Sequence, residues 1–220
     1  MDDVEKQCAE LLKRRGARSV GGFDWGPDDP GGKGKGKRIS EWMQLSGFID
    51  AAGPLGLKVD PASKKHRDPP HDKPDAELTC DAVRWGVELT ELCCPTVRKN
   101  NRRILNTETS ANGSRSIFPE GWQYREWTSE SLQCELAKRV RSKDEEWQEY
   151  ETFPVNCVVF STDEIGLDPS MAEAVIKSMQ PIETTFVDRA FFVMDYHPGL
   201  DHPCWELPIR KRRKLVTSHS

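Results

Sequence analysis

Apolar and polar positions repeat along the chain with two periods, which predict its helices and strands. Apolar residues recur at helical spacing in four segments, within residues 2–15, 40–52, 129–150 and 171–179. Short apolar or alternating runs bounded by turn residues predict strands at residues 55–59, 76–78, 83–92, 155–160 and 185–196. A polar, Pro-rich stretch at 60–73 and a long Arg- and Asn-rich stretch at 96–127 are expected to be loops.

Two elements carry polar side chains at positions where the pattern predicts contact with other elements. On the strand at 83–92, Glu88 shares a face with Gly86 and Thr90, while Val87 and Leu89 face the other side. On the helix at 129–150, Lys143 falls in the middle of an apolar stripe. This stripe comprises Leu132, Leu136, Val140, Trp147 and Tyr150.

The order of elements predicts the fold class. Strands that alternate with helices favour an α/β sandwich with a central mixed β-sheet flanked by helices. We expect residues 1–38 to form an N-terminal helix followed by a flexible Gly/Pro/Lys-rich segment. Residues 39–207 would form the α/β domain, and residues 208–220 a basic, disordered tail.

Composition narrows the class of protein. The chain has 220 residues and a formal net charge of -4, so it is not uniformly basic, although a local basic surface remains compatible with that charge. No run of about 18 apolar residues predicts a membrane span. Its 7 cysteines are an odd number without CxxC spacing, which favours reduced thiols and a cytoplasmic location.

The positions of two carboxylates would be explained by a bound metal ion. Glu88 interrupts a half-buried strand, and Asp75 lies at the start of the strand expected to pair with it. Unpaired burial of a carboxylate costs several kcal/mol. Two carboxylates that converge repel each other unless a cation neutralises them, and oxygen ligands suit Mg²⁺ or Mn²⁺.

The run of Pro74-Asp75 followed by GVELTEL resembles the signature of PD-(D/E)xK nucleases. The resemblance covers about residues 40–160 and implies a restriction-endonuclease-like αβββαβ core. It implies that Asp75 and Glu88 bind Mg²⁺ for hydrolysis of phosphodiester bonds. Glu41, on the preceding helix, resembles the additional acidic residue that many members place beside the metal.

The sequence departs from this signature at the lysine. Thr90 occupies that position, two residues after Glu88. Some nucleases of this class supply the missing charge from the following helix, and Lys143 is the natural candidate there, since Lys138 points to the opposite side. Thr90 and Gln133 would be secondary polar contributors to catalysis.

A basic cluster follows the candidate strand. It comprises Arg98, Lys99, Arg102 and Arg103, and its location suits the phosphates of a nucleic acid, with DNA favoured over RNA. A solvated loop would explain the same residues equally well. No membrane partner is expected, and a homodimer remains open because many nucleases act as dimers.

Each candidate residue also has a plainer explanation. Asp75 would be a turn residue after Pro74, Glu88 an exposed residue on an edge strand, and Glu41 an acid favoured by the first turn of its helix. Lys143 would pair with Glu146 or Glu135 on a solvated edge. The alternatives to a nuclease are a degenerate relative that binds nucleic acid or a protein, and an interaction protein without metal dependence.

Three further motifs are set aside. GGKGKGKR at 31–38 nearly matches a phosphate-binding loop, but Arg38 replaces its Ser or Thr and no strand precedes it. His197, His202 and Cys204 lack an evident fourth ligand for zinc. The tail run KRRK at 211–214 resembles a nuclear-localisation or nucleic-acid patch, but such runs are common by chance.

Overall fold

The computed structural model describes residues 35–67, 73–94, 96–97, 99–100, 103–104, 121, 123–162, 164, 166–194 and 202–212. The predicted N-terminal helix and most of the Gly/Pro/Lys-rich segment lie outside these residues. The described elements, in chain order, are α2 (Lys35–Ala52), η1 (Gly53–Leu55), β1 (Val59–His66), β2 (Ala76–Cys80), β3 (Val83–Glu91), α4 (Ser129–Glu146), η2 (Trp147–Glu149), β4 (Val155–Thr162), α5 (Pro169–Ser178), β5 (Ile182–Thr184), β6 (Arg189–Met194), β7 (Cys204–Glu206) and β8 (Ile209–Lys211).

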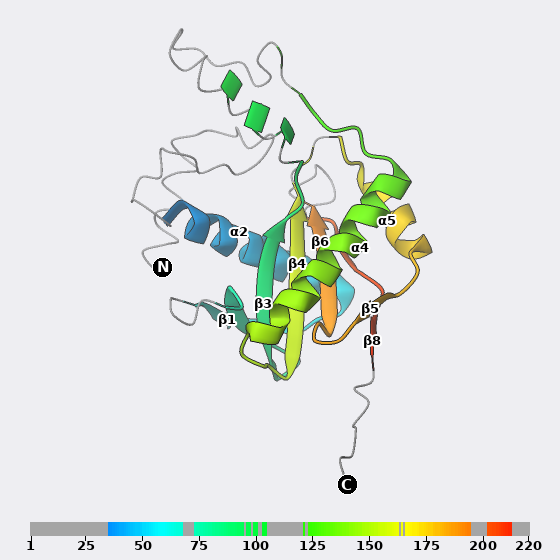
Figure 1. The fold of residues 1–220 in the computed structure, drawn as a ribbon. Helices are drawn as coiled ribbons and strands as arrows, with labels where there is room; N and C mark the ends of the chain where they lie inside the picture. The colour runs from blue at the N-terminus through cyan, green and yellow to red at the C-terminus, as the bar shows by residue number, and fades with distance from the viewer. Residues whose placement is uncertain are drawn as a thin grey trace.

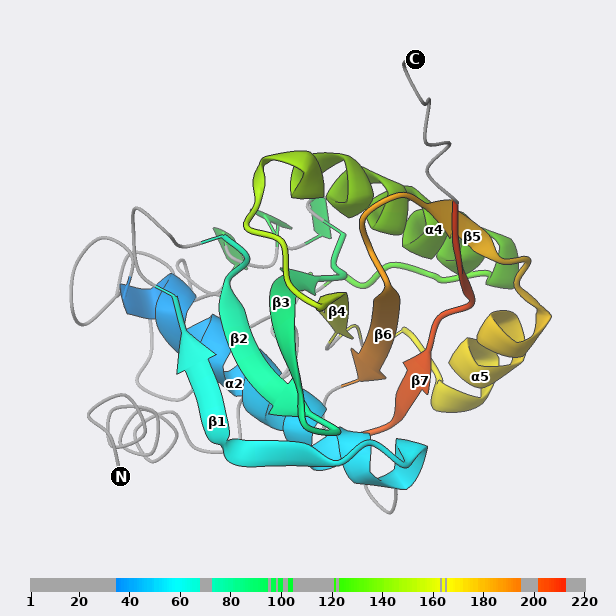
Figure 2. The same ribbon diagram turned by 90° about the horizontal axis from the view of Figure 1, so that it is seen from below.

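The centre of the molecule is a mixed sheet with strand order β1-β2-β3-β4-β6-β7 (Figure 1). Strands β1, β2 and β3 pair antiparallel, β3, β4 and β6 pair parallel, and β7 returns antiparallel to β6. Helix α4 connects β3 to β4, the long crossover that a parallel pair requires. Strands β5 and β8 form a separate parallel pair beside α4 and α5 (Figure 2).

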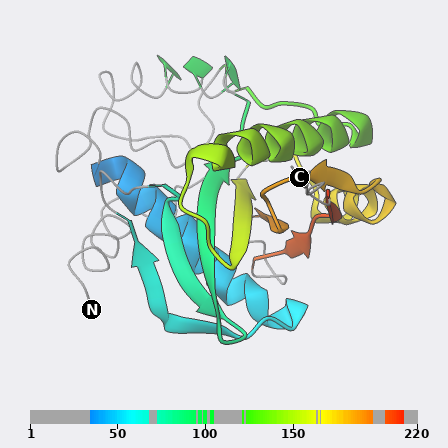
Figure 3. The ribbon, with the colours of Figure 1, turned by 60° about the horizontal axis from the view of Figure 1, so that its bottom comes forward.

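Helices cover both faces of the sheet, with α2 and α4 on opposite sides (Figure 3). Val87, Val159 and Phe191 pack with α2 in one core, whereas Phe160 and Phe192 pack with α4 and α5 in the other. Strands β4 and β6 are therefore apolar on both faces, as buried parallel strands generally are. The predicted α/β class, with a mixed sheet flanked by helices, is confirmed.

Helices α4 and α5 both begin at side-chain caps. The Thr128 side chain caps α4 by accepting a hydrogen bond from the Ser131 backbone N–H, and the Thr128 backbone N–H donates to the Ser131 hydroxyl oxygen. In α5, Asp168 accepts from the backbone N–H groups of Ser170 and Met171, and Pro169 occupies the first turn. Four of the five apolar side chains in the predicted stripe are buried: Leu132, Leu136, Val140 and Trp147.

Several boundaries differ from the sequence prediction. The strand expected at 55–59 lies instead at β1, inside the stretch expected to be a polar loop. Because β1 is an edge strand, its charged side chains remain in water, so charge does not prevent pairing. The described residues at 96–97, 99–100 and 103–104 are helical, although a loop was predicted there.

The C-terminal part also differs from the prediction. The strand expected at 185–196 begins only at Arg189, because residues 185–187 bind a helix side chain described below instead of extending the ladder. Residues 209–211, assigned to the tail from the sequence, form β8. Within the described part of the chain, no helix combines the length and apolar character needed to cross a bilayer.

Candidate functional site

Strand β3 directs Glu88 toward α4, in agreement with the predicted alternation. Its neighbours Val87 and Leu89 pack on the α2 side, and the Glu88 side chain is buried on the other. Lys143 of α4 lies above it, with its Nζ 2.9 Å from Glu88 Oε1. The helical phase explains this contact, since Lys143 is three residues after the buried Val140.

Three more side chains complete a polar cluster around this ion pair. Lys143 Nζ also donates to Glu146 Oε2 at 2.7 Å, and the Tyr150 hydroxyl lies 3.1 Å from that oxygen and 3.5 Å from Glu88 Oε1. Lys73 Nζ donates to the Tyr150 hydroxyl at 3.1 Å. We call Glu88, Lys143, Glu146, Tyr150 and Lys73 the Glu88 cluster.

Asp75 lies beside this cluster at the start of β2. The pairing of Ala76 with Val87, extended by one position, sets Asp75 next to Glu88. The buried Asp75 carboxylate accepts a hydrogen bond from the Leu89 backbone N–H, with 2.9 Å between Oδ2 and N. Asp75 therefore satisfies a β3 donor at the point where the β2 ladder begins.

Burial and charge fix the protonation of the cluster. Burial raises the pKa of Tyr150 far above its usual value, and the charges of Glu88, Glu146 and Asp75 raise it further. Burial alone would lower the pKa of Lys143, but hydrogen bonds and charge from Glu146 and Glu88 outweigh it and raise that pKa. Near neutral pH the cluster therefore holds a charged ammonium and a neutral phenol.

One oxygen of the cluster lacks a hydrogen bond. Glu88 Oε2 is buried and has no hydrogen-bond partner among the described residues. An unsatisfied buried carboxylate oxygen costs about 1–3 kcal/mol or more. Such an atom is suited to a ligand that brings a donor or a cation.

Glu41 lies elsewhere. Its Oε2 is 2.7 Å from His66 Nε2, and both side chains are largely buried. His66 pairs in register with Ala76, which belongs to the core beneath α2. The structure thus sets Glu41 with His66 on the α2 side, whereas the Glu88 cluster lies on the α4 side.

The remaining predicted residues have varied positions. Thr90 shares the Glu88 face of β3 and is half-buried, and Gln133 is half-buried on α4. Lys99 and Arg103 are exposed in the helical segment after β3, while Arg98 and Arg102 lie outside the described residues. Among the described residues, no three His, Cys, Asp or Glu side chains are grouped so that they could hold a metal ion by themselves.

The sequence named Glu146 only as an alternative partner of Lys143, and it did not identify Tyr150 and Lys73 as members of this site. Glu146 and Tyr150 follow Lys143 by three and seven positions, a spacing that predicts one face of a continuous helix. That spacing was a usable signal, but Tyr150 was interpreted only as an apolar position. The position of Lys73 depends on the fold and has no local signal.

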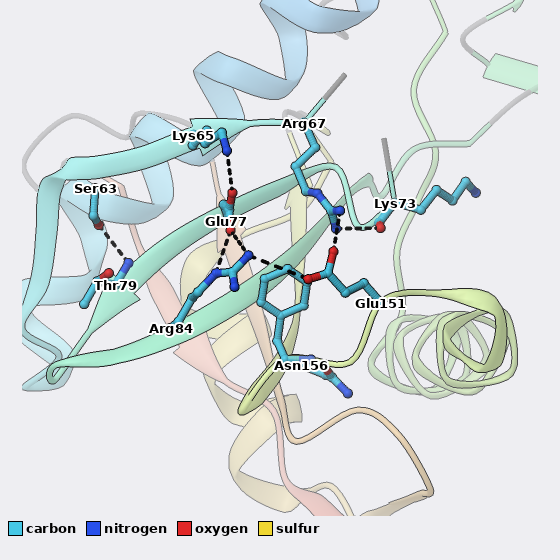
Figure 4. Close-up of polar contacts among 10 residues, drawn as sticks. Ser63, Lys65, Arg67, Lys73, Glu77, Thr79, Arg84, Glu151 and Asn156 are labelled. Atoms are coloured by element: carbon cyan, nitrogen blue, oxygen red, sulfur yellow. Dashed lines mark hydrogen bonds and ion pairs between the residues drawn. The ribbon is translucent and has the colours of Figure 1, made fainter. Parts of the chain in front are cut away.

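A second set of ionic contacts fixes the chain around Lys73 (Figure 4). Arg67 donates to the Lys73 carbonyl oxygen at 2.7 Å and to Glu151 Oε2 at 2.6 Å. The guanidinium groups of Arg67 and Arg84 lie 5.4 and 4.7 Å from the centre of the Phe153 ring. The ring packs directly on Gly86, where a Cβ would lie 2.5 Å from a ring carbon, so β3 requires glycine there.

The Glu146–Lys143 pair is expected to stabilise the protein only within a pH window. Although burial opposes it, Lys143 lowers the pKa of Glu146 below 4.5, so this contribution is lost as pH falls through the folded pKa. The raised pKa of Lys143 means that its contribution is complete below 10.5 and is lost at higher pH. Melting temperatures of wild type and Glu146→Gln should differ at pH 7, and the difference should disappear as pH falls through the lowered pKa of Glu146. A difference that persists below that pKa would exclude this ion pair as its source.

The chain was compared with protein-family models, with curated proteins and with solved structures, and none of them matches it. Function is therefore argued from the side chains themselves. The relevant features are a buried carboxylate with one unsatisfied oxygen, a second carboxylate beside it, and an ammonium group in direct contact.

Proposed function

We propose that the protein hydrolyses phosphodiester bonds in nucleic acid with Mg²⁺ or Mn²⁺ bound by Asp75 and Glu88, in a restriction-endonuclease-like core. The observation that carries this proposal is the 2.9 Å contact between Lys143 Nζ and Glu88 Oε1. Lys143 on α4 would thereby supply the positive charge that Thr90, at the lysine position on β3, cannot supply. The order α2, β1 to β3, α4 and β4 is compatible with the αβββαβ arrangement.

The donor set fits a hard divalent cation. Both candidate ligands are carboxylates, and one buried oxygen, Glu88 Oε2, lacks a hydrogen-bond partner among the described residues. Mg²⁺ is commonly held by one or two carboxylates, with substrate phosphates and water completing its coordination. Two acids without a third protein ligand are therefore sufficient. The bound ion would lower the pKa of a water molecule and stabilise charge on the phosphate.

The residues of the chain would have distinct tasks. Asp75, held by the Leu89 backbone, would keep its carboxylate beside Glu88. Lys143 would orient the attacking water or stabilise the charge that develops on the phosphate. Exposed basic residues after β3, including Lys99 and Arg103, would contact the nucleic-acid backbone, with DNA favoured over RNA. We also propose a cytoplasmic location, which the reduced cysteines support.

The alternative is a relative that has lost catalysis and binds nucleic acid or a protein partner. The observation that favours it is the position of Lys143 between two carboxylates, since Glu88 and Glu146 both contact its ammonium group. These contacts stabilise Glu88 without a metal. The presence of Thr90 at the lysine position also favours this alternative.

Calorimetric titration with MnCl₂ and MgCl₂ separates the two functions. Wild type should bind Mn²⁺, and Asp75→Asn and Glu88→Gln should each weaken binding by about tenfold or more, a typical loss at metal sites. Glu149→Gln, an exposed acid on η2, should bind like wild type. The same proteins should then be tested for cleavage of plasmid DNA and of RNA. Metal binding that both site substitutions leave intact would favour the binding protein.

A further inference from the structure

Glu146 occupies a position surrounded by donors from separate parts of the chain. Its Oε2 accepts from Lys143 Nζ at 2.7 Å and from the Tyr150 hydroxyl at 3.1 Å. Lys73, from the segment before β2, reaches the same hydroxyl at 3.1 Å and acts on Glu146 through its charge. The carboxylate thus accepts from one ammonium group and one phenol, and a second ammonium group donates to that phenol.

This position lies nearer to solvent than Glu88 does. The Glu146 side chain is 38% exposed, compared with 19% for Lys143 and 5% for Glu88. An anion arriving from solvent would therefore meet the donors of Glu146 before it reached Glu88. Glu146 lies in the last turn of α4, and its side chain can turn outward without any change in the backbone.

We infer that Lys143, Tyr150 and Lys73 form a binding position for a phosphate group, and that the Glu146 carboxylate occupies this position until phosphate replaces it. The inference deepens the proposed function and rests on it for the identity of the substrate. The donors are an ammonium group on α4, a phenol after η2 and an ammonium group before β2. A phosphate oxygen accepts from the same donors that a carboxylate oxygen uses.

The charges of the cluster favour this exchange. Glu88, Glu146 and the adjacent Asp75 bring three negative charges, while Lys143 and Lys73 bring two positive charges. Outward movement of Glu146 leaves two of each sign, and a divalent cation at the acids would add positive charge. The two lysines would then attract a phosphate anion. The Tyr150 hydroxyl, 3.1 Å from Glu146 Oε2, would be available to donate to phosphate when Glu146 moves away.

A simple ion pair on the helix surface explains less of this arrangement. An i,i+3 pair needs only Lys143 and Glu146. Lys73 is fixed instead from another direction, since Arg67 binds its carbonyl oxygen and the Lys73 ammonium lies 5.0 Å from the centre of the Tyr150 ring. The donors are therefore held in place independently of Glu146.

Titration with inorganic phosphate, followed by nuclear magnetic resonance in buffer containing EDTA, tests this position without metal or cleavage. Glu146→Ala should bind phosphate about fivefold or more tightly than wild type, since loss of one competing ion pair is worth roughly that factor. Glu145→Ala removes the same charge from an exposed neighbour and provides the matched control. Adding Lys73→Ala to Glu146→Ala should abolish the gain. Thermal unfolding would verify that each variant is folded.

The result that overturns the inference is equal phosphate affinity in Glu146→Ala and Glu145→Ala, or no measurable binding in either. A gain that survives Lys73→Ala would also overturn it, because the site requires that ammonium group. These outcomes are independent of the metal titration. If the protein binds phosphate as expected but cuts no nucleic acid, the inferred phosphate position stands and the nuclease proposal fails.

Discussion

Replacing Lys143 with alanine is expected to lower the rate of nucleic-acid cleavage by about 100-fold or more, while affinity for Mn²⁺ is kept or increased. The loss of rate follows from removal of the positive charge next to the reacting phosphate, an effect of this size at many catalytic sites. Metal affinity should not fall, because the ammonium group contacts Glu88 Oε1 at 2.9 Å and competes with a cation for that carboxylate. Cleavage assays and calorimetry on the same protein measure both quantities.

Lys138→Ala is the matched control, since Lys138 is exposed on the same helix. It should leave both the rate and the metal affinity unchanged. Lys143→Ala also leaves a buried carboxylate without its cation, and such a loss destabilises proteins by several kcal/mol. The assays should therefore be run well below the melting temperature of the variant. If rate and metal affinity fell together in proportion to stability, Lys143 would be a structural partner of Glu88 and not a catalytic residue.

Asp144→Ala is expected to reduce the free energy of unfolding by about 3 kcal/mol or more, and urea denaturation would measure the loss. The Asp144 carboxylate is buried on α4 and accepts from three successive backbone N–H groups. These belong to Thr185, Phe186 and Val187, at 2.8, 2.7 and 2.8 Å from its oxygens. The substitution removes the acceptor and leaves these donors without it.

Asp144→Asn should recover part of the stability, because its amide oxygen still accepts hydrogen bonds. Glu145→Ala, at the exposed neighbouring position, should cost less than about 0.5 kcal/mol. A loss below about 1 kcal/mol for Asp144→Ala would mean that water replaces the carboxylate at little cost.

Periodicity was sufficient to predict the elements that carry the candidate site. The alternation in β3 set Glu88 opposite Val87, and the helical phase of α4 placed Lys143 on the face that meets the sheet. Both predictions depend on the angle per residue within one element. Such angles vary little, so local sequence determines them well. The contact of 2.9 Å between the two side chains follows from that phase and the packing of α4 on β3.

Features that depend on tertiary pairing could not be read from the sequence. Strand β1 is charged and contains Pro61, and it becomes a strand only because β2 offers an edge. Nothing in the sequence indicated that the Glu41 carboxylate contacts His66, since His66 was assigned to a loop. Asp75 could be recognised as notable, while its bond to the Leu89 backbone depends on the register of β2 with β3.

The pairing of β8 with β5 has a practical meaning for work on the basic C-terminal segment. The Ile182 backbone donates to the Pro208 carbonyl, and the Arg212 backbone donates to the Thr184 carbonyl, both at 2.7 Å. Residues up to Arg212 are thus integrated into the domain near α4. A shortened form or a fusion that probes the segment beyond it should retain Arg212. A junction before Arg212 would expose the buried Ile182. Loss of folding could then not be distinguished from loss of the basic charges.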